Sequence, residues 1–292
     1  MQRSNDGGEA PVPCAATSPR CREDRVSYLD GLPRSSYLKR VSLEPLTIIH
    51  FTNSAAALKG ILSDGFNIKY CKEGIWFRDA EKKFRIPMVS FCDIPIAQAK
   101  DHMEKYGNYA LGLTEEWANG KGLTPVTYLQ RHSPRAESML NALNLGIDAT
   151  KRNPNDKPLM DVLQVLRFTK NFKGEVRRRN GDIIPEYYFG YESEWRYSPD
   201  TGRFHKFIFP EEAFKDKEMA DMVQKLIDDE RLSFTAKDVR YIIIEKEEER
   251  AGFESHIRSL TKQFTEEERE CLITRIRTAE QIKEESECQK SS

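Results

Sequence analysis

Leu46-Thr-Ile-Ile-His-Phe-Thr52 is the first segment of this 292-residue chain with the pattern of a folded core. Four of its first six residues are apolar and the segment is rich in β-branched residues, which predicts a buried strand. Asn53 or Ser54 is placed to cap a short helix after this strand, and Gly65 is placed to end that helix. We therefore expect the globular part of the protein to begin at about residue 46.

Later segments extend the pattern of strands. Pro87–Phe91 is expected to form a second strand, and the alternation in Asn108–Thr114 is typical of a half-buried one. The apolar run in Val239–Glu245 predicts a central strand. Between Pro87–Phe91 and Asn108–Thr114, Asp93 as N-cap and Pro95 in the first turn predict the start of a helix.

Helical patterns occupy other stretches of the chain. One opens at Ser133-Pro134, and a second surrounds residues 159–166. Residues 124–129 predict another strand, and Asn180-Gly181 is typical of a β-hairpin turn. Because strands and helices do not alternate strictly, the predicted fold class is α+β, with mixed, mainly antiparallel sheets and flanking helices.

The last helical segment has both a start signal and an apolar face. Thr265 and Glu268 have the spacing of a capping box. The apolar stripe that follows consists of Leu272, Ile276, Ala279 and Ile282. We expect one continuous helix here, and the surface around residues 265–286 is a candidate contact for a partner.

Residues 1–45 differ in composition from the rest. They hold five of the 14 prolines and almost no apolar periodicity, so they cannot bury enough apolar surface to offset the entropy of ordering. The predicted organisation is a disordered or weakly ordered N-terminal tail, a single α+β domain over 46–285, and a C-terminal tail over 286–292.

Charge and hydropathy exclude several classes of protein. The 46 Lys and Arg residues nearly balance the 47 Asp and Glu residues, which argues against nucleic-acid binding through bulk charge. No apolar run is long enough to span a bilayer, and the N-terminus lacks the apolar region of a secretory signal. Six cysteines without C-x-x-C spacing do not form a disulfide scaffold or a zinc site. We expect a cytoplasmic protein with reduced thiols and no metal.

Classical catalytic motifs are absent, but polar residues stand inside apolar, strand-like segments. The sequence lacks a phosphate-binding P-loop, a dinucleotide-binding glycine motif and a nucleophile elbow. His50, Phe51 and Thr52 form the first polar-containing cluster. A histidine at a strand end is also commonly structural, so this cluster has an ordinary explanation as well as a functional one.

A second candidate cluster lies at the second predicted strand and the helix after it. It contains Ser90 and Asp93, followed by His102 and Tyr106, which are four residues apart and share a helix face. Packing is the alternative explanation for the last two. Cys92 beside them is either a reactive thiol or, as is commoner for cysteine, part of the core.

The third cluster combines two carboxylates and an arginine. Period-2 alternation predicts that Glu192, Glu194 and Arg196 share one strand face. Two like carboxylates raise one pKa unless the arginine or solvent intervenes. The alternative is an ion-paired face of an edge strand. Nearby, the basic cluster is either a solvated hairpin tip or a phosphate contact; it comprises Arg167, Lys170, Lys173, Arg177, Arg178 and Arg179.

Taken in order, these motifs resemble the AbiGi family, bacterial proteins of abortive-infection phage resistance. The similar segments lie within about residues 46–285: Ile48–Thr52, Pro87–Pro95, His102 with Tyr106–Leu113, Glu116-Trp117, Pro125–Tyr128, Glu192–Tyr197 and Asp238–Ile244. This resemblance implies the antitoxin half of a toxin–antitoxin pair, whose toxin partner is similar to a nucleotidyltransferase. It implies a role in defence and defines no reaction.

A more distant resemblance, to the ADP-ribosyltransferase fold, implies chemistry. The similar features are a histidine at a strand end, a serine on a later strand and a late Glu-x-Glu, which in that fold surround NAD. By this resemblance, His50 would bond the ribose or amide, Ser90 would support the nicotinamide pocket, and Phe51 or Tyr106 would stack on the ring. Glu194 would hold the ribose 2′-hydroxyl and stabilise the developing charge.

The same resemblance assigns roles to further residues. Glu192 would orient the acceptor or act as its base. Thr52, Asp93, His102 and Arg196 would complete the cofactor-binding set. The chain departs from the pattern at the aromatic pair that usually encloses nicotinamide, for which Trp76-Phe77 is the nearest equivalent.

Two hypotheses therefore stand at this point. The first is an enzyme similar to ADP-ribosyltransferases that cleaves NAD and modifies nucleic acid or protein. The second is a non-catalytic antitoxin or regulator that binds a toxin partner or DNA. Nucleic-acid contact would involve Arg177, Arg178 and Arg179, and neither hypothesis needs a membrane.

Overall fold

The predicted first strand is present as β1 (Thr47–Thr52), inside a mixed sheet. In this computed structural model the described residues are 47–152, 157–177, 181–199 and 208–290, so the predicted N-terminal tail lies outside them. The other strands of the sheet are β3 (Lys69–Phe77), β4 (Ala80–Asp93), β5 (Tyr109–Thr114), β6 (Thr124–Pro125), β11 (Glu194–Tyr197), β12 (Phe209–Pro210), β14 (Val239–Ile244) and β15 (Ile276–Thr278). Among the described residues, the main path runs β15-β14-β5-β1-β4-β11-β6, with β3 and β12 also paired to β4.

Three smaller strand pairs and a set of helices surround this sheet. The pairs are β2 (Phe66–Asn67) with β13 (Arg231–Leu232), β7 (Thr127–Leu129) with β8 (Thr169–Asn171), and β9 (Lys173–Arg177) with β10 (Ile183–Tyr188). The helices are α1 (Ala55–Asp64), α2 (Ala99–Tyr106), α3 (Glu115–Gly120), α4 (Pro134–Arg152), α5 (Lys157–Leu166), α6 (Lys217–Lys225), α7 (Arg250–Ser259), α8 (Glu266–Thr274) and α9 (Ala279–Lys290). None of these described helices has the length and apolar character needed to cross a membrane.

Most strand pairs are antiparallel, as predicted for the α+β class. The parallel pairs among the described strands are β14 with β15 and β7 with β8. β9 and β10 pair antiparallel on either side of the predicted Asn180-Gly181 turn, and residues 178–180 of that turn lie outside the described part of the chain. The predicted first helix begins at its Ser54 cap, whose side chain accepts a hydrogen bond from the backbone of Ala57, and ends at Gly65.

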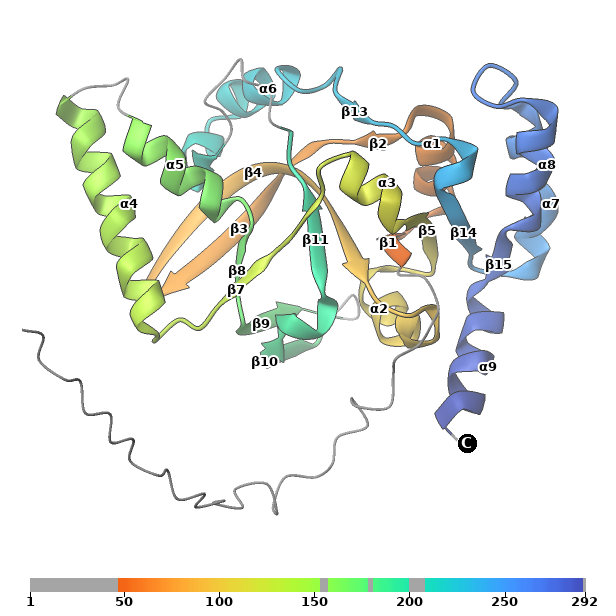
Figure 1. Cartoon of the computed structure of the whole chain (residues 1–292), viewed down its shortest axis with the longest axis horizontal. Helices are drawn as coiled ribbons and strands as arrows, with labels where there is room; N and C mark the ends of the chain where they lie inside the picture. Colours follow the sequence, from red (N-terminus) through yellow and green to blue (C-terminus); the bar gives the residue numbers. More distant parts are fainter. Residues whose placement is uncertain (1–46, 153–156, 178–180, 200–207, 291–292) are drawn as a thin grey trace, which may run out of the picture. The chain divides into compact units, whose positions relative to one another are not determined.

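Consecutive residues of β1 pack on opposite faces of the sheet, as strand geometry requires. Ile48 belongs to a core that α1, α3, α7 and α8 close on one face. Ile49 belongs to a second core, closed by α2 and α9 on the other face. Helices therefore cover both faces of the central strands, and α7, α8 and α9 lie next to the end of the sheet formed by β14 and β15 (Figure 1).

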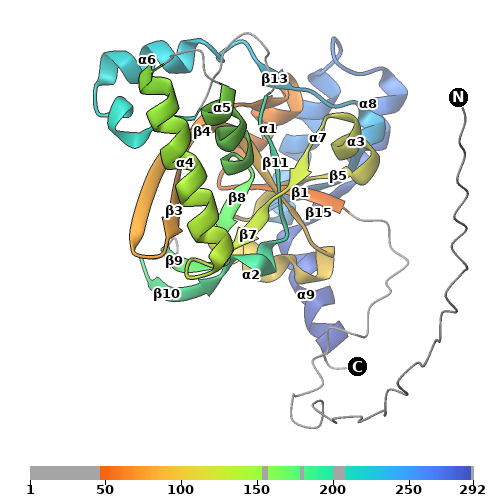
Figure 2. The same ribbon diagram turned by 60° about the vertical axis from the view of Figure 1, so that its left-hand side comes forward.

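β4 has 14 residues and connects this sheet to a third core. Its first half pairs with β3 and packs against α4 and α5 through Phe84, Ile86 and Met88. Its second half pairs with β1 and β11 and contributes Val89 and Phe91 to the core beneath α1. Both views show α4 and α5 beside the β3–β4 hairpin (Figures 1 and 2).

Two local predictions were wrong in detail. Asp93 does not cap a helix: it is the last residue of β4 and pairs with Ile48, and a short 3-10 turn after Pro95 leads into α2. The strand Tyr109–Thr114 is not half-buried, because β1 and β14 flank it and helices cover both of its faces.

The two other differences concern continuity. The predicted strand at 124–129 divides into β6, which pairs with β11, and β7, which pairs with β8. The predicted last helix begins at its capping box but ends at Thr274, and β15 is inserted before α9. Its apolar stripe lies in the cores, with Leu272 and Ile282 fully buried, and so is not a surface for a partner.

Candidate functional site

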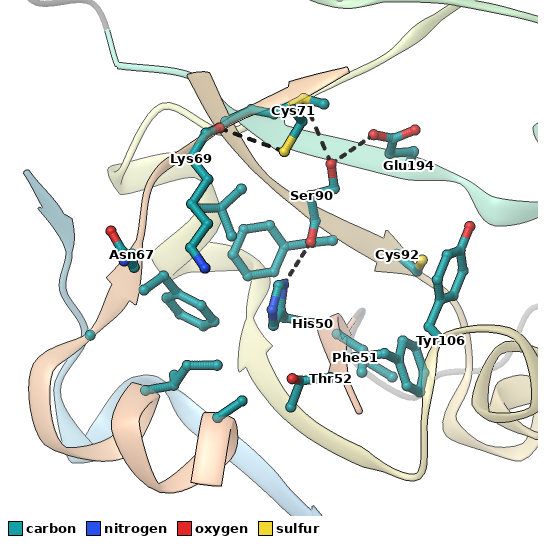
Figure 3. Close-up of a pocket in the computed structure, with 18 of the residues that line it drawn as sticks. His50, Phe51, Thr52, Asn67, Lys69, Cys71, Ser90, Cys92, Tyr106 and Glu194 are labelled. Carbon is teal, nitrogen blue, oxygen red and sulfur yellow. Dashed lines mark hydrogen bonds between the residues drawn. The ribbon is translucent and has the colours of Figure 1, made fainter. Parts of the chain in front are cut away.

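A cavity of about 660 Å³ lies where β1 and β4 separate (Figure 3). The two strands pair at Ile48–Asp93 and Ile49–Cys92, and among the described residues their pairing goes no further toward the end of β1. The last three residues of β1, His50–Thr52, therefore line the cavity on one side. β4 and β11 contribute Ser90 and Glu194 on another side, while α1 and the start of β3 complete the wall.

His50 bridges the gap between the strands with its side chain. Its Nδ1 lies 2.9 Å from the backbone oxygen of Ser90. A carbonyl oxygen accepts hydrogen bonds, so Nδ1 carries the proton in this contact and Nε2 of the neutral ring is an acceptor. Burial lowers the pKa of His50, against the opposing effect of the bond to Ser90. The residue is therefore a neutral hydrogen-bond acceptor at pH 7.

Ser90 and Glu194 meet across neighbouring strands. The Ser90 hydroxyl donates to Oε1 of Glu194 at 2.9 Å, because β4 and β11 pair with Arg196 opposite Ser90. The same carboxylate accepts from Arg196 Nε at 2.7 Å and from Lys170 Nζ at 2.8 Å. One serine and two cations thus hold Glu194 in a single orientation at the cavity wall.

Glu192 lies at this site, but a different element from the predicted one carries it. It is not on the strand: it ends the 3-10 turn Phe189–Glu192, and Ser193 then turns the chain into β11. Its carboxylate accepts from Tyr106 at 2.6 Å and from Lys170 at 3.1 Å, and it also contacts Lys105. Lys170 therefore joins the two carboxylates, although Glu192 does not share the strand face of Glu194 and Arg196.

The charges of these residues determine the protonation of the site. Burial alone would raise the pKa of Glu194, but Arg196 and Lys170 outweigh it and hold this pKa at about 2. For Glu192, burial is likewise outweighed, by Lys170 and Lys105, and its pKa is lowered. Burial and the charge of Glu192 raise the pKa of Tyr106 well above its usual range. Both carboxylates are ionised at pH 7 and the phenol keeps its proton.

A third carboxylate completes a balanced network. Glu73 on β3 lies 3.1 Å from Nη2 of Arg196, whose side chain is fully buried. Glu73, Glu192 and Glu194 thus face Lys105, Lys170 and Arg196. An ionised carboxylate in such a network is a weak base. It can still accept a hydrogen bond from a ligand hydroxyl or stabilise a positive charge nearby.

The structure gathers most of the predicted residues around this cavity. His50, Phe51, Thr52, Ser90, Tyr106, Glu192 and Glu194 line it. Asp93, His102 and Arg196 do not, although Arg196 orients Glu194 from behind, and the His102 ring stacks on Phe51 with centroids 5.8 Å apart. The aromatic pair Trp76-Phe77 is outside the lining as well, since Phe77 is buried in the core beside α4 and α5.

Two cations of the site, Lys105 and Lys170, were not indicated there by the sequence pattern. Lys105 lies between the predicted pair His102 and Tyr106 on α2, and Lys170 belonged to a basic cluster interpreted as a solvated hairpin tip or a phosphate contact. Arg167 of the same basic cluster is also buried, where it donates to Ser198 Oγ at 2.7 Å and to the oxygen of Pro199. The side chains of Arg177, Arg178 and Arg179 lie outside the described part of the chain.

Two further observations concern the thiol in the cavity and potential metal ligands. Cys92 lines the cavity but is buried, and burial together with the charge of Glu192 raises the pKa of its thiol. It is therefore a protonated core thiol rather than a thiolate nucleophile. Among the described residues, no group of three or more His, Cys, Asp and Glu side chains is placed to hold a metal ion.

Comparison with known proteins gives this fold and site a family. The chain belongs to the AbiGi family: the family described as "Putative abortive phage resistance protein AbiGi, antitoxin" matches residues 65–245. The abortive phage resistance protein AbiGi of Lactococcus lactis subsp. cremoris is 26% identical over 224 residues, which cover 70% of this chain and 90% of that protein. No solved structure matches the chain.

Proposed function

We propose that this AbiGi-family chain is a phage-resistance enzyme that cleaves NAD and transfers ADP-ribose to a nucleic acid or protein. One observation carries the proposal: His50, Ser90 and Glu194 come from three strands and meet at one cavity, joined by two hydrogen bonds of 2.9 Å. Family membership supports the role in abortive infection. The reaction is our inference from the site.

The cavity has the size and the hydrogen-bond acceptors that suit such a ligand. Its volume of about 660 Å³ falls in the range of small-molecule sites. The neutral His50 ring supplies an acceptor, the ionised Glu194 supplies a second, and Phe51 supplies an apolar face that His102 supports from behind. A ribose with its hydroxyl groups, next to a flat amide-bearing ring, is complementary to this combination.

Each residue then has a defined role. Bound NAD would supply a ribosyl carbon whose bond to nicotinamide breaks with the electron pair leaving on nicotinamide, while the acceptor's lone pair forms the new bond and its proton passes to water. Glu194 accepts a bond from a ribose hydroxyl and stabilises positive charge at that carbon. Ser90 keeps Glu194 oriented. Glu192 orients the acceptor and is a weak base, because its pKa is lowered.

The test measures nicotinamide release and label transfer. Purified protein is incubated with NAD labelled on the adenylate part and with phage-infected cell extract as the source of acceptors. We expect Glu194→Gln to lower both signals by at least about 100-fold, since it removes the charge that stabilises the transition state. Glu137→Gln is the matched control, because Glu137 is an exposed carboxylate paired with Arg78.

Two outcomes of this experiment would contradict the proposal. Equal turnover in Glu194→Gln and the native protein would refute the role of Glu194. If the native protein releases no nicotinamide under any of these conditions, the enzymatic function is wrong. Circular dichroism of each variant establishes that it is folded.

A second candidate function is a non-catalytic antitoxin that binds a toxin partner. The observation that favours it is that Lys170 and Arg196 already neutralise Glu192 and Glu194, as in a structural network. The description of the family also includes the word antitoxin. The partner would be a nucleotidyltransferase-like toxin. A Glu194→Gln protein that protects cells from phage as well as the native protein would favour this function over the enzyme.

A further inference from the structure

A second hollow, of about 380 Å³, lies at the opposite end of β1 from the cavity. Thr114 of β5, one of its lining residues, pairs with Thr47 at the start of β1, whereas the cavity lies at His50–Thr52. The lining of this hollow consists of Thr114, Lys237, Val239, Arg240, Tyr241 and Arg275. Half of these residues are cationic and none is acidic.

An irregularity in β14 places Arg240 at this hollow. Val239 pairs with Leu113 of β5 and Tyr241 pairs with Gly112, so Arg240 has no partner residue opposite it and forms a β-bulge. A bulge redirects the side chain of the extra residue, and bulges are common beside functional sites. Gly112 permits the arrangement, because a Cβ at this position would lie 3.2 Å from the Tyr241 ring.

One donor of the half-buried Arg240 guanidinium has no partner in the described part of the chain. This donor, Nε, is buried and has no hydrogen-bond acceptor among the described residues. A buried N–H without an acceptor is costly, so an unmatched one in a folded protein calls for a bound water, ion or ligand. Asp238 beside it does not serve this purpose, since its carboxylate accepts from Thr235 N at 2.7 Å and from Thr235 Oγ1 at 2.8 Å.

The other two cationic side chains, Arg275 and Lys237, line the same hollow as Arg240. Arg275 is the residue after α8, and its Nη1 donates to the backbone oxygens of Ala236 and Val239, which fixes the guanidinium at the rim of the hollow. Lys237 is exposed in the turn before β14. Thr114 accepts from Trp117 N with its hydroxyl oxygen and keeps its own proton for donation.

We propose that this hollow is a phosphate-binding site that holds a phosphate group of a nucleotide or a nucleic acid. Phosphate offers several acceptor oxygens, and it matches the planar donors of Arg240 and Arg275 better than a single carboxylate does. Lys237 adds a third positive charge at the open side. The site is separate from the cavity and does not depend on the reaction proposed there.

Binding experiments on the purified full chain test this site. The probes are inorganic phosphate and ADP, measured by calorimetry, and a short fluorescein-labelled single-stranded oligonucleotide, measured by anisotropy at increasing NaCl. Arg240→Gln should weaken binding of at least one probe by about tenfold or more. Arg135→Gln, which removes one exposed arginine from α4, should bind as the native protein does.

The probes distinguish the sources of the phosphate. Tight binding of ADP assigns the site to a nucleotide, and tight, salt-sensitive binding of the oligonucleotide assigns it to nucleic acid. In a parallel thermal scan, the probe with the highest affinity should raise the melting temperature of the native protein and of Arg135→Gln more than that of Arg240→Gln. Lys237→Gln provides a second variant at an exposed position, where misfolding is not expected.

Two results would overturn the proposal. One is either no binding of any probe to the native protein or equal affinity of Arg240→Gln, Lys237→Gln and the native protein for every probe that binds. The other is loss of binding in the double variant Arg178→Gln/Arg179→Gln with full binding in Arg240→Gln, which would place the phosphate contact at the hairpin between β9 and β10.

Discussion

Ser193 shows how one backbone angle arranges the charged groups of the site. Its φ of 42° lies in the left-handed region, which costs a residue with a side chain about 1 kcal/mol or more. The turn ends the 3-10 segment at Glu192 and starts β11 at Glu194, and its carbonyl accepts a bond of 3.0 Å from the Asp93 backbone. The strain is therefore held by pairing with β4, and it directs two carboxylates toward Lys170.

The lowered pKa of Glu194 predicts a specific acid sensitivity. Its pKa is about 2 in the folded protein against an ordinary 4.5, so between these values the unfolded chain binds the proton and the folded one does not. The stabilisation is complete above about pH 5 and is lost as the pH falls toward 2. We expect the native protein to lose on the order of 2 kcal/mol more than Glu194→Gln over this range.

Urea unfolding at several pH values measures this difference. Glu137→Gln is again the control, because it removes an exposed carboxylate and should retain the native pH dependence. Parallel curves for Glu194→Gln and the native protein between pH 5 and the acid limit would contradict the assigned charge network.

At the level of elements, the interruption of the predicted C-terminal helix determines where its apolar residues are buried. β15, which lies between α8 and α9, pairs parallel with β14. This pairing buries the apolar stripe of the segment in the cores on the two faces of the sheet. Ile282 is fully buried against the face that carries Ile49. α9 is therefore a structural element of the domain.

This packing predicts unequal costs for two aliphatic truncations. Ile282→Ala should destabilise the protein by about 2–5 kcal/mol, because it leaves a cavity in a core. Leu145→Ala on α4, where the side chain is 69% exposed, should change the free energy of unfolding by less than about 0.5 kcal/mol. Urea denaturation compares them. Near-equal effects would mean that α9 does not pack on the sheet in solution.

At the level of the whole domain, β4 joins cores that would otherwise be separate. Its first half packs against α4 and α5, and its second half lies in the central sheet, with no break between them. Unfolding of either core disrupts the strand that the other one uses. The described domain should consequently unfold in a single cooperative transition.

Tryptophan fluorescence can test this cooperativity at two positions. Trp76 reports on the β3–β4 hairpin, where Arg131 lies 4.6 Å from its ring centroid, and Trp117 reports on the central core. One variant keeps Trp76 alone (Trp117→Phe/Trp195→Phe) and another keeps Trp117 alone (Trp76→Phe/Trp195→Phe). In each, the fluorescence transition in urea should coincide with that of far-UV circular dichroism. An earlier change at Trp76 would show that α4 and α5 form an independent unit.

Local patterns predicted the elements well and their ends less well. The strand at residues 46–52, the cap at Ser54 and the capping box at Thr265 depend on neighbouring residues, and the structure contains all three. Asp93 did not become a cap, because pairing with β1 uses its backbone in the sheet. The helix over 265–286 was interrupted because parallel pairing with β14 outweighed helical periodicity.

The amino-acid sequence by itself determined the α+β class, the first strand, the AbiGi resemblance and part of the cavity lining, including His50, Ser90 and Glu194. Tertiary structure decided their charge state and arrangement. Lys105 and Glu192 are 87 residues apart, and Lys170 and Glu194 are 24 apart, so no pattern spanning a few residues could pair them. Helical and strand periodicities report which face a residue occupies. Which elements meet at that face depends on how the whole sheet is assembled, and that assembly places three cations against three carboxylates.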